Sequence, residues 1–316
     1  MAASREMNEF ELIRRLTHDL PRHPRVVVGV GDDCAVLDLG LPDRWVLFKT
    51  DAVVEGVHFD AGALPEQIGH KALARCLSDV AAMGGEASSA LITLGLPTAF
   101  DVARIEGVYR GLNALAARHG VAIVGGETTT NPDRLLLSVC LLGSVEKTRC
   151  VTRSGAQPGD ALFVSGVLGG SLRGRHLCFE PRLAEARWLT GHFAVHAMID
   201  LSDGLAGDLR HLLESSRVGA ELLAAAIPIS REAKRAARER PDAKSALSAA
   251  LTDGEDFELL FSVSSRDAVP LLDAWRERFP DLGLACIGKI LAERGVRLRD
   301  ERGVRPLEAH GYIHFA

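Results

Sequence analysis

The chain has 316 residues, of which 47% are hydrophobic and 25% are charged, a balance typical of a soluble globular protein with a substantial core. Its net charge of −5 gives no positive field, which argues against nucleic acid or an anionic membrane as partner. The charged N-terminus lacks the apolar core of a secretion signal, and the apolar stretch 135–142 is far shorter than the roughly 20 residues of a membrane span. The six scattered cysteines lack a C-x-x-C pair, which favours reduced thiols and predicts a cytoplasmic protein.

The first half of the chain predicts helices that alternate with strands. Apolar residues at helical spacing predict a helix over 8–20 that ends at Pro21. A second helix is expected to begin at Pro65, to reach Met83 and to end at Gly84-Gly85. The other expected elements are a helix over 101–119 and strands over 26–30, 45–50, 87–96, 121–124 and 135–143.

The polar, turn-rich segment 147–160 predicts a domain boundary, with domains at 1–148 and 149–316. Beyond it, strands are expected at 161–166, 195–200 and 258–263, and helices at 183–190 and after Gly204. Residues 231–244 are charged and predict a solvated helix. The fold class is therefore α/β or mixed α+β.

The stretch 28–38, VGVGDDCAVLD, places Gly-X-Gly directly after an apolar run, as a phosphate-binding loop would. It does not complete G-x-G-x-x-G, and no G-x-x-x-x-G-K-[ST] motif occurs, so Rossmann and P-loop sites are disfavoured. Two aspartates follow, although carboxylates repel phosphate unless a cation lies between them. We interpret the glycines as a turn that presents Asp33, with or without Asp32, to a metal ion.

Carboxylates beside small or hydroxyl residues recur at six places, which are 31–33, 50–51, 78–79, 126–127, 200–203 and 254–256. Any single one is more simply explained as a turn, a helix cap or an exposed charge. Six converging sites would repel one another without cations, and Mg²⁺ prefers oxygen ligands together with substrate phosphates. The set predicts a site for several Mg²⁺ ions and phosphates if its members converge, which periodicity alone does not establish.

Two further features favour anion binding. Gly125-Gly126-Glu127 follows a predicted strand, so its backbone N–H groups could line a concavity that holds an anion. Arg153 in the boundary segment is a candidate bidentate phosphate ligand, although a plain surface arginine is an equally good reading of that residue alone.

Taken together, these motifs resemble the thiamine-monophosphate kinase family of the aminoimidazole-ribotide synthetase-like superfamily. The phrases that carry the resemblance run in family order over nearly the whole chain: GVGDDCAVL, KTDAVVEGVHF, KALARCLSDVAAMGGEA, VGGETT, VTRSGAQPGD, IDLSDGLAGDL, DGEDFELLF and GYIHF. The combination of TD-x-x-V-E-G-V-H-F with LSD-x-A-A-M-G is highly specific, whereas the short glycine and aspartate pieces alone are not.

The resemblance implies ATP-dependent phosphorylation of thiamine phosphate by a homodimer. It implies the superfamily's two-domain fold, with an N-terminal domain that binds ATP and forms the dimer sheet and a C-terminal α/β domain that closes the cleft. The implied Mg²⁺ ligands are Asp33, Thr50, Asp51, Asp79, Glu127, Asp200 and Asp203. The implied ATP contacts are Gly126, Glu127, Arg153 and Ser202, and the implied contacts to thiamine phosphate are His58 and Glu255.

The chain departs from the family pattern at several of these positions. Glu127 stands where many relatives have aspartate, which puts its ligand geometry in question. Lys49 stands where some relatives have a small hydroxyl residue and is given no metal role. Ala309 replaces an aromatic residue that contacts thiamine in some members, so ring recognition there requires other residues.

The expected mechanism is direct in-line transfer of the γ-phosphoryl group, with no covalent nucleophile and no phospho-enzyme. Two alternatives stay open. One is another ATP-dependent synthetase of the superfamily, although no cysteine precedes the first glycine-rich loop and the tail GYIHFA contains none. The other is a non-catalytic nucleotide-binding homologue.

Overall fold

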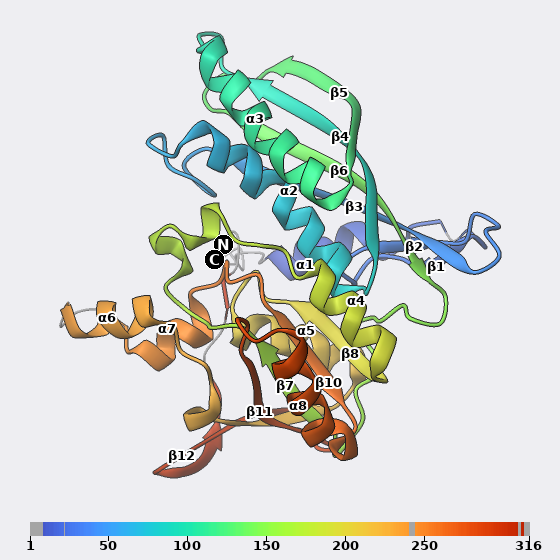
Figure 1. The fold of residues 1–316 in the computed structure, drawn as a ribbon, viewed down its shortest axis with the longest axis vertical. Coiled ribbons are helices and arrows are strands. Elements are labelled where there is room, and N and C mark those ends of the chain that lie inside the picture. Colours follow the sequence, from blue (N-terminus) through green and yellow to red (C-terminus); the bar gives the residue numbers. More distant parts are fainter. Residues whose placement is uncertain (1–8, 22, 240–243, 309–310, 313–316) are drawn as a thin grey trace, which may run out of the picture.

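The computed structural model describes residues 9–21, 23–239, 244–308 and 311–312. These residues form two β-sheets with helices packed on and between them, as Figure 1 shows. The mixed α/β class predicted from the sequence is therefore confirmed. Among the described residues, no helix has both the length and the apolar character needed to cross a bilayer.

The N-terminal sheet has six strands in the order β1-β2-β3-β6-β4-β5. All neighbours are antiparallel except β4 and β5, which are parallel. The strands are β1 (Val26–Val28), β2 (Ala35–Leu37), β3 (Arg44–Val54), β4 (Glu86–Leu96), β5 (Ala122–Thr130) and β6 (Leu136–Glu146). Helices α2 (Pro65–Ala82) and α3 (Val102–His119) lie on one face of this sheet (Figure 1).

The C-terminal sheet has seven strands in the order β13-β12-β9-β11-β7-β10-β8. Its strands are β7 (Ala161–Ser165), β8 (Val195–Asp200), β9 (Gly219–Leu223), β10 (Leu259–Val263), β11 (Leu284–Leu291), β12 (Gly295–Asp300) and β13 (Gly303–Pro306). Five helices accompany it, which are α4 (Leu183–His192), α5 (Leu205–Ser216), α6 (Arg231–Glu239), α7 (Ala246–Thr252) and α8 (Ala268–Arg278).

Helix α2 joins the two halves of the molecule. It contacts β3 and β6 on one side and α4 and β8 on the other, and most of its residues are buried. Leu73 and Leu77 of α2 belong to the same apolar core as Phe163 of β7 and Phe261 of β10, whose rings are stacked. This continuous core holds the end of β8 against α2, and the candidate site lies at this contact.

Local signals account for the helix ends. Pro65 begins α2 because its missing N–H costs nothing at a first helical position, and Gly84 follows the helix with a φ of 70°. The carboxylate of Asp101 accepts a hydrogen bond from Ala103 N at the start of α3, and Gly120 ends that helix in the left-handed conformation.

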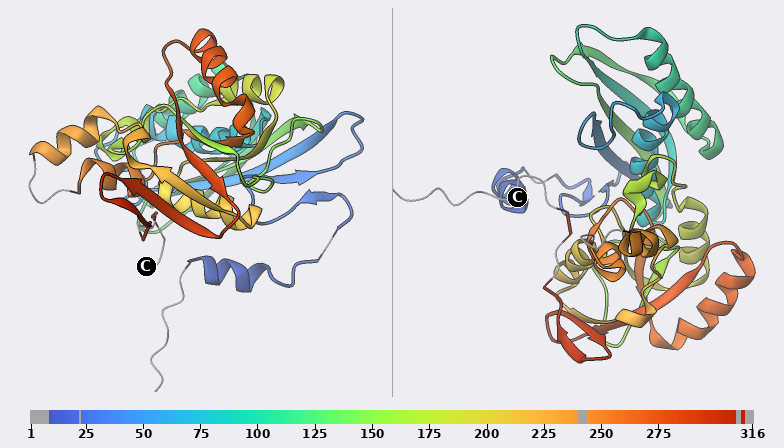
Figure 2. Two further views of the ribbon diagram at one scale, coloured as in Figure 1. Left: turned by 90° about the horizontal axis from the view of Figure 1, so that it is seen from below. Right: turned by 90° about the vertical axis from the view of Figure 1, so that its left-hand side faces the viewer.

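Several predicted elements differ from the structure in extent; strand β3, for example, runs over Arg44–Val54 and not only over 45–50. Helix α1 (Glu9–Thr17) ends earlier than predicted, and Ile13 and Leu16 on its apolar stripe are exposed because the helix stands apart from the body of the molecule (Figure 2). Strand β5 continues through Gly125 and Gly126 to Thr130, where a loop was expected. A side chain at Gly126 would collide with the carbonyl oxygen of Ile92, so glycine permits this close pairing with β4.

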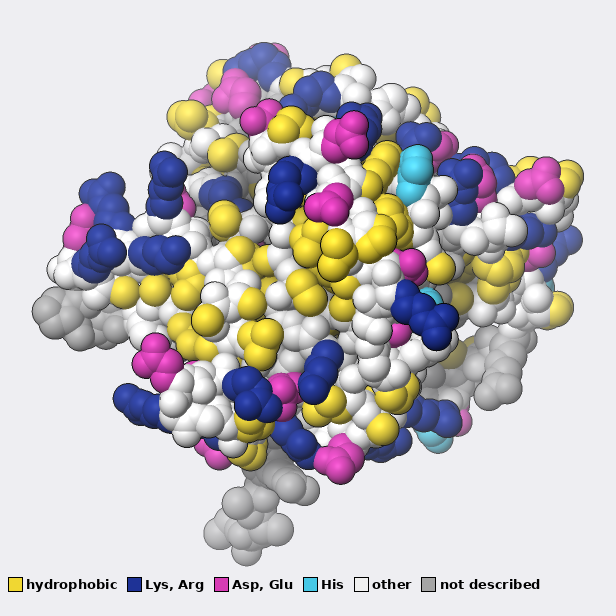
Figure 3. Space-filling view, turned by 60° about the horizontal axis from the view of Figure 1, so that its bottom comes forward, with side chains coloured by type: hydrophobic (Ala, Val, Ile, Leu, Met, Phe, Trp, Pro, Cys, Tyr) yellow, Lys and Arg dark blue, Asp and Glu magenta, His cyan; other side chains and the backbone are white. Residues whose placement is uncertain are grey.

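The surface carries mixed charges. On the face in Figure 3, Lys and Arg side chains lie dispersed among Asp and Glu, and hydrophobic side chains gather near the middle. Charge on this face is therefore balanced locally, in keeping with the small net charge of the chain.

Candidate functional site

Three buried carboxylates from distant parts of the sequence meet in the structure. One carboxylate oxygen from each of Asp33, Asp79 and Asp200 lies within 4.8 Å of the others, and all three residues are buried. We call them the three-carboxylate group. They come from a turn, a helix and a strand end, so the fold gathers three of the six acidic places in the sequence.

Local structure explains how each carboxylate reaches this point. Gly31 has a φ of 114°, which only glycine adopts readily, and this turn between β1 and β2 directs the chain toward Asp33. Asp79 lies on the buried surface of α2, and Asp200 is the last residue of β8. The Asp32 carboxylate instead accepts hydrogen bonds from the backbone N–H groups of Asp33 and Arg153, so it stabilises the turn.

Each carboxylate of the group has a partner, but one oxygen does not. Lys49 Nζ donates to Asp79 at 2.8 Å, Arg153 Nη2 donates to Asp33 Oδ1 at 2.6 Å, and Ser78 Oγ donates to Asp200 at 2.6 Å. Asp33 Oδ2 is buried and has no hydrogen-bond partner among the described residues. A buried carboxylate oxygen without a partner is costly, so a ligand is expected there.

The ionisation of the group reflects this crowding. Burial, with the negative charge of Asp33, raises the pKa of Asp200 to about 6. Burial raises the pKa of Asp79 well above its ordinary value, although the adjacent Lys49 ammonium opposes the shift. A bound cation would reverse both effects by stabilising the charged carboxylates.

The residues of the group fit a hard cation such as Mg²⁺. The donors are carboxylate oxygens from three elements, and one is already without a partner. Mg²⁺ is bound in proteins by a few carboxylates together with substrate phosphates. Lys49 pairs with Asp79 and Arg153 pairs with Asp33, whereas the partner of Asp200 is the neutral hydroxyl of Ser78.

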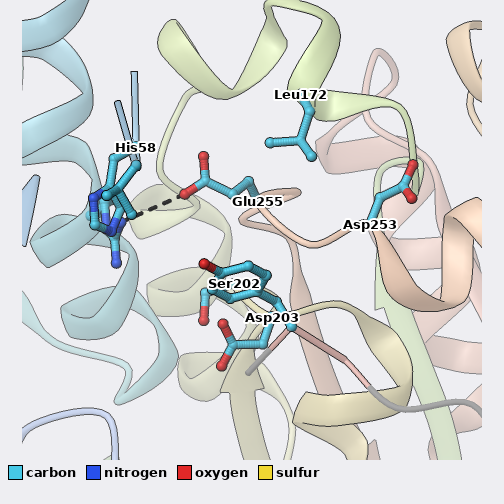
Figure 4. Close-up of a pocket in the computed structure, with 9 residues that line it drawn as sticks. His58, Leu172, Ser202, Asp203, Asp253 and Glu255 are labelled. Carbon is cyan, nitrogen blue, oxygen red and sulfur yellow. Dashed lines mark ion pairs between the residues drawn. The ribbon is translucent and has the colours of Figure 1, made fainter. Parts of the chain in front are cut away.

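A cavity of about 150 Å³ lies where the two halves of the molecule meet (Figure 4). His58 projects into it from the N-terminal half, while Ser202, Asp203, Asp253 and Glu255 line it from the C-terminal half. The remaining lining residues are Val57, Arg75, Leu172 and Tyr312. Two residues predicted to contact substrate and two predicted to contact ATP or metal therefore share one cavity.

Glu255 is held at this cavity by two cations from α2. The buried Lys71 ammonium donates to Glu255 Oε2 and also, at 2.6 Å, to the carbonyl oxygen of His58. Arg75 Nη1 lies 3.6 Å from Glu255 Oε1, an ion pair marked by the dashed line in Figure 4. Glu255 has a φ of 56°, which is rare for a residue with a side chain, so its contacts hold it in a strained conformation.

Arg75 also binds Asp51. Its Nε and Nη2 atoms donate to the two oxygens of the Asp51 carboxylate at 2.9 and 3.2 Å. This bidentate pair, although burial opposes it, lowers the pKa of Asp51. Asp51 is therefore ionised beside the cavity, but it lies outside the three-carboxylate group.

The orientation of His58 follows from one backbone contact. Its Nδ1 atom accepts a hydrogen bond from Val54 N at 3.1 Å. A neutral imidazole that accepts at Nδ1 carries its proton on Nε2, so that nitrogen is a donor. Such a donor suits a phosphate oxygen.

Thr50, Gly126 and Glu127 are not brought to the three-carboxylate group. Side chains alternate along β3, so Lys49 and Asp51 face α2 while Thr50 is exposed on the opposite, outer face. The strand register aligns Glu127 of β5 with Thr93 of β4, Ser138 of β6 and Ala52 of β3. Ala52 lies two residues after Thr50 on the same strand, so Glu127 is exposed on the same outer face as Thr50. The predicted metal set is therefore divided between the two faces of the N-terminal sheet.

Several site residues escaped the sequence analysis. No role was predicted for four residues that contact the cavity, its carboxylates or the three-carboxylate group, namely Lys71, Arg75, Ser78 and Tyr312. The available signal was the pair of cations one helical turn apart, Lys71 and Arg75, on the helix that also carries Asp79. Ala309 lies outside the described residues.

A second buried charged group lies in the C-terminal half. It consists of Asp256, Glu258, Arg175 and Arg182, and we call it the paired group. Arg182 donates to both oxygens of Glu258 at 2.8 and 2.7 Å, and Arg175 donates to Asp256 at 2.7 Å. Ser165 Oγ and Gly169 N supply further hydrogen bonds to these carboxylates.

Comparison with known proteins places this site in a family. Residues 31–145 match the AIR synthase related protein, N-terminal domain. A thiamine-monophosphate kinase of Rhodopirellula baltica is 44% identical over 83% of this chain and 83% of its own length, and one of Bacillus subtilis is 33% identical over 98% and 100%.

Solved structures agree with this placement. The structure described as AaThiL complexed with AMPPCP and TMP is 31% identical, covers 99% of both chains and has a TM-score of 0.83. The hydrogenase maturation protein HypE of E. coli is 22% identical, covers 97% of this chain and 99% of its own, has a TM-score of 0.70, and shares the fold alone. This chain belongs to the thiamine-monophosphate kinase family.

Proposed function

We propose that this protein transfers the γ-phosphoryl group of ATP to thiamine phosphate, giving thiamine diphosphate and ADP. The three-carboxylate group, whose Asp200 lies two residues before the cavity-lining Ser202, carries the proposal. A buried carboxylate oxygen without a partner, gathered with two other buried carboxylates, suits cations that accompany phosphates. Family membership supports ATP and thiamine phosphate as the two substrates that supply these phosphates.

The chemical problem is to bring two polyanions together. The acceptor oxygen of a phosphate is already anionic at neutral pH, so no strong protein base is required. Repulsion between two unit charges in contact is about 4 kcal/mol at an effective dielectric constant near 20. Bound Mg²⁺ would neutralise this charge and stabilise the transition state.

We assign roles to the chain's own residues on this basis. Asp33, Asp79 and Asp200 would hold Mg²⁺, with Asp51 and Asp203 nearby. Arg153, which is held by Asp33, and Ser202 would bind ATP phosphates. His58 and Glu255 would contact thiamine phosphate, and they line the same cavity as Ser202 and Asp203. Transfer would be direct, without a covalent intermediate on the chain.

The decisive test is release of ADP with Mg²⁺ and thiamine phosphate, measured beside thiamine and beside ribonucleotide precursors of aminoimidazole ribotide. We expect turnover with thiamine phosphate and none with the ribonucleotides. Turnover with a ribonucleotide alone would favour another synthetase of the superfamily, and ATP binding without turnover would favour a non-catalytic homologue. A phosphorylated chain trapped with labelled ATP would contradict direct transfer.

We also propose a homodimer that forms through the outer face of the N-terminal sheet. Strands β3, β4, β5 and β6 each expose one large apolar side chain, namely Phe48, Leu91, Val124 and Leu142. Glu127 lies three strands from β3, about 14 Å, which exceeds the reach of its side chain. The proposed Mg²⁺ roles of Glu127 and Thr50, and the proposed ATP contacts of Gly126 and Glu127, therefore depend on the assembled dimer.

Light scattering tests this assembly directly. We expect twice the chain mass of 33.9 kDa for the wild type and the monomer mass for Leu142→Glu, which places a charge on the apolar face. Val269→Glu is the matched control, because Val269 is also apolar and exposed, at 67% against 42% for Leu142, but lies on α8. A wild-type monomer would contradict the proposal.

We further propose that the chain has two domains and that it is a cytoplasmic protein. Each sheet is built from one side of 147–160, which supports domains at 1–148 and 149–316, although one apolar core spans both. All six cysteines are described and free, which suits a reducing cytoplasm.

A further inference from the structure

The cavity beside the three-carboxylate group has one cationic wall. Among the described residues that line it, Arg75 is the only lysine or arginine, and it shares the lining with Asp203, Asp253 and Glu255. We propose that Arg75 is a substrate-binding residue whose guanidinium receives the phosphate of the acceptor. This inference rests on the proposed function, since the acceptor considered is thiamine phosphate.

The donors of Arg75 are only partly used. Nε and Nη2 donate to Asp51, while Nη1 lies 3.6 Å from Glu255 Oε1, which is an ion-pair distance but longer than a hydrogen bond. The Arg75 side chain is 15% exposed and borders the cavity. Its Nη1 atom can therefore donate to a ligand without losing a hydrogen bond.

Glu255 does not require Arg75 as its partner. Lys71, one helical turn before Arg75 on α2, is fully buried and already pairs with the other oxygen of Glu255. Lys71 is not among the described residues that line the cavity. The two cations are thus divided by position, since Lys71 holds the loop and Arg75 borders the space that a ligand would enter.

Charge explains why an acceptor phosphate would need this arginine. The cavity wall carries three carboxylates, so an incoming phosphate meets repulsion unless a cation receives it. A guanidinium binds phosphate through two parallel N–H groups, which a lysine ammonium cannot reproduce. A cation bound at Asp51 would also release Nε and Nη2 of Arg75, so occupancy of Asp51 and phosphate binding would favour each other.

Calorimetry with matched variants tests the assignment. Thiamine phosphate and thiamine are titrated into the wild type, Arg75→Gln and Arg75→Lys, with Mg²⁺ present. We expect Arg75→Gln to bind thiamine phosphate about 30-fold more weakly and thiamine unchanged, and Arg75→Lys to lie between. In turnover, KM for thiamine phosphate should rise by a similar factor, and KM for ATP should stay constant.

Arg44→Gln is the control, because Arg44 also lies in the N-terminal half and pairs with Glu86, yet does not line the cavity. It should bind both ligands like the wild type. Equal loss of thiamine and thiamine phosphate in Arg75→Gln, or loss of neither, would overturn the assignment, because only the phosphate distinguishes the two.

Failure of the proposed function gives a different result. If the wild type releases no ADP with thiamine phosphate, that function fails, and inorganic phosphate then tests Arg75. Weaker binding of inorganic phosphate by Arg75→Gln than by the wild type would uphold a phosphate site at Arg75. Equal binding, or no binding by the wild type, would overturn it.

Discussion

The three-carboxylate group and the paired group both contain buried carboxylates with cationic partners, yet they differ in whether every carboxylate oxygen has a partner. In the paired group, Arg182 binds both oxygens of Glu258, and Asp256 is bound by Arg175 and Gly169 N. In the three-carboxylate group, Asp33 Oδ2 has no partner among the described residues. Full pairing compensates the cost of burying a charge, whereas a buried carboxylate oxygen without a partner, such as Asp33 Oδ2, indicates a place for a ligand.

The largest expected effect is the loss of turnover when Asp200 of the three-carboxylate group is replaced by asparagine. Asp200→Asn keeps an oxygen that can accept from Ser78 but removes one carboxylate from the three-carboxylate group. We expect kcat to fall roughly a thousandfold, about 4 kcal/mol of transition-state stabilisation. The free energy of unfolding without Mg²⁺ should not fall, because crowding of like charges is relieved.

Asp160→Asn is the matched control for this change. Asp160 is also buried and also accepts from a serine, Ser262, but it lies outside the cavity and the three-carboxylate group. Its kcat should stay near the wild-type value. In thermal unfolding, added Mg²⁺ should raise the Tm of the wild type and of Asp160→Asn but not that of Asp200→Asn. Wild-type turnover in Asp200→Asn would contradict the metal assignment.

The next effect concerns stability and not turnover. Glu258→Gln in the paired group leaves the half-buried Arg182 with only the more distant Glu185 carboxylate, at 3.9 Å, and Glu258 itself is only 1% exposed. Removing one partner of a buried pair costs about 3 kcal/mol. Urea denaturation should show this loss, while kcat at a temperature where the variant is folded should change little. If Glu258→Gln lost turnover but kept its stability, the paired group would not differ in role from the three-carboxylate group.

The sequence could single out Asp33, Asp79 and Asp200 as carboxylates beside apolar segments, but it could not predict that these three converge while Asp51, Asp203 and Glu127 lie outside the group. Asp33, Asp79 and Asp200 each stand at or beside a buried element, and carboxylates in such places are conspicuous. The roles of Lys71 and Arg75 could not be predicted in this way. Ile68, Leu73 and Leu77 predict one apolar side of α2, so cations elsewhere on the helix resemble a solvated face. The helix is buried on several sides only because the C-terminal half packs over it.

Pairing between distant strands explains the other differences. Gly125 and Gly126 have the composition of a turn, but parallel pairing with β4 extends them into β5. Nothing local to 122–130 reveals that partner. Thr50 and Asp51 are neighbours in sequence and were assigned to one metal shell, yet strand alternation places them on opposite faces of β3.

The smallest expected effect tests whether Asp256 of the paired group, whose hydrogen-bond partners are all in place, is also ionised in the folded protein. Burial raises the pKa of Asp256 to about 7, although Gly169 N–H and Arg175 oppose the shift, whereas the ordinary value is 3.8. The folded protein then binds a proton between about pH 4 and 7 that the unfolded chain has released. The stabilisation is therefore present below pH 4 and is lost as pH rises through 7.

Asp256→Asn, which cannot ionise, should remove this dependence. Relative to the variant, the wild type should lose about 2 kcal/mol of unfolding free energy between pH 5 and pH 8, measured by urea denaturation at each pH. Parallel pH profiles for the two proteins would show that Arg175 keeps Asp256 ionised throughout. The paired group would then be a fully charged cluster, and the open oxygen of Asp33 would be the sole feature that separates the two groups.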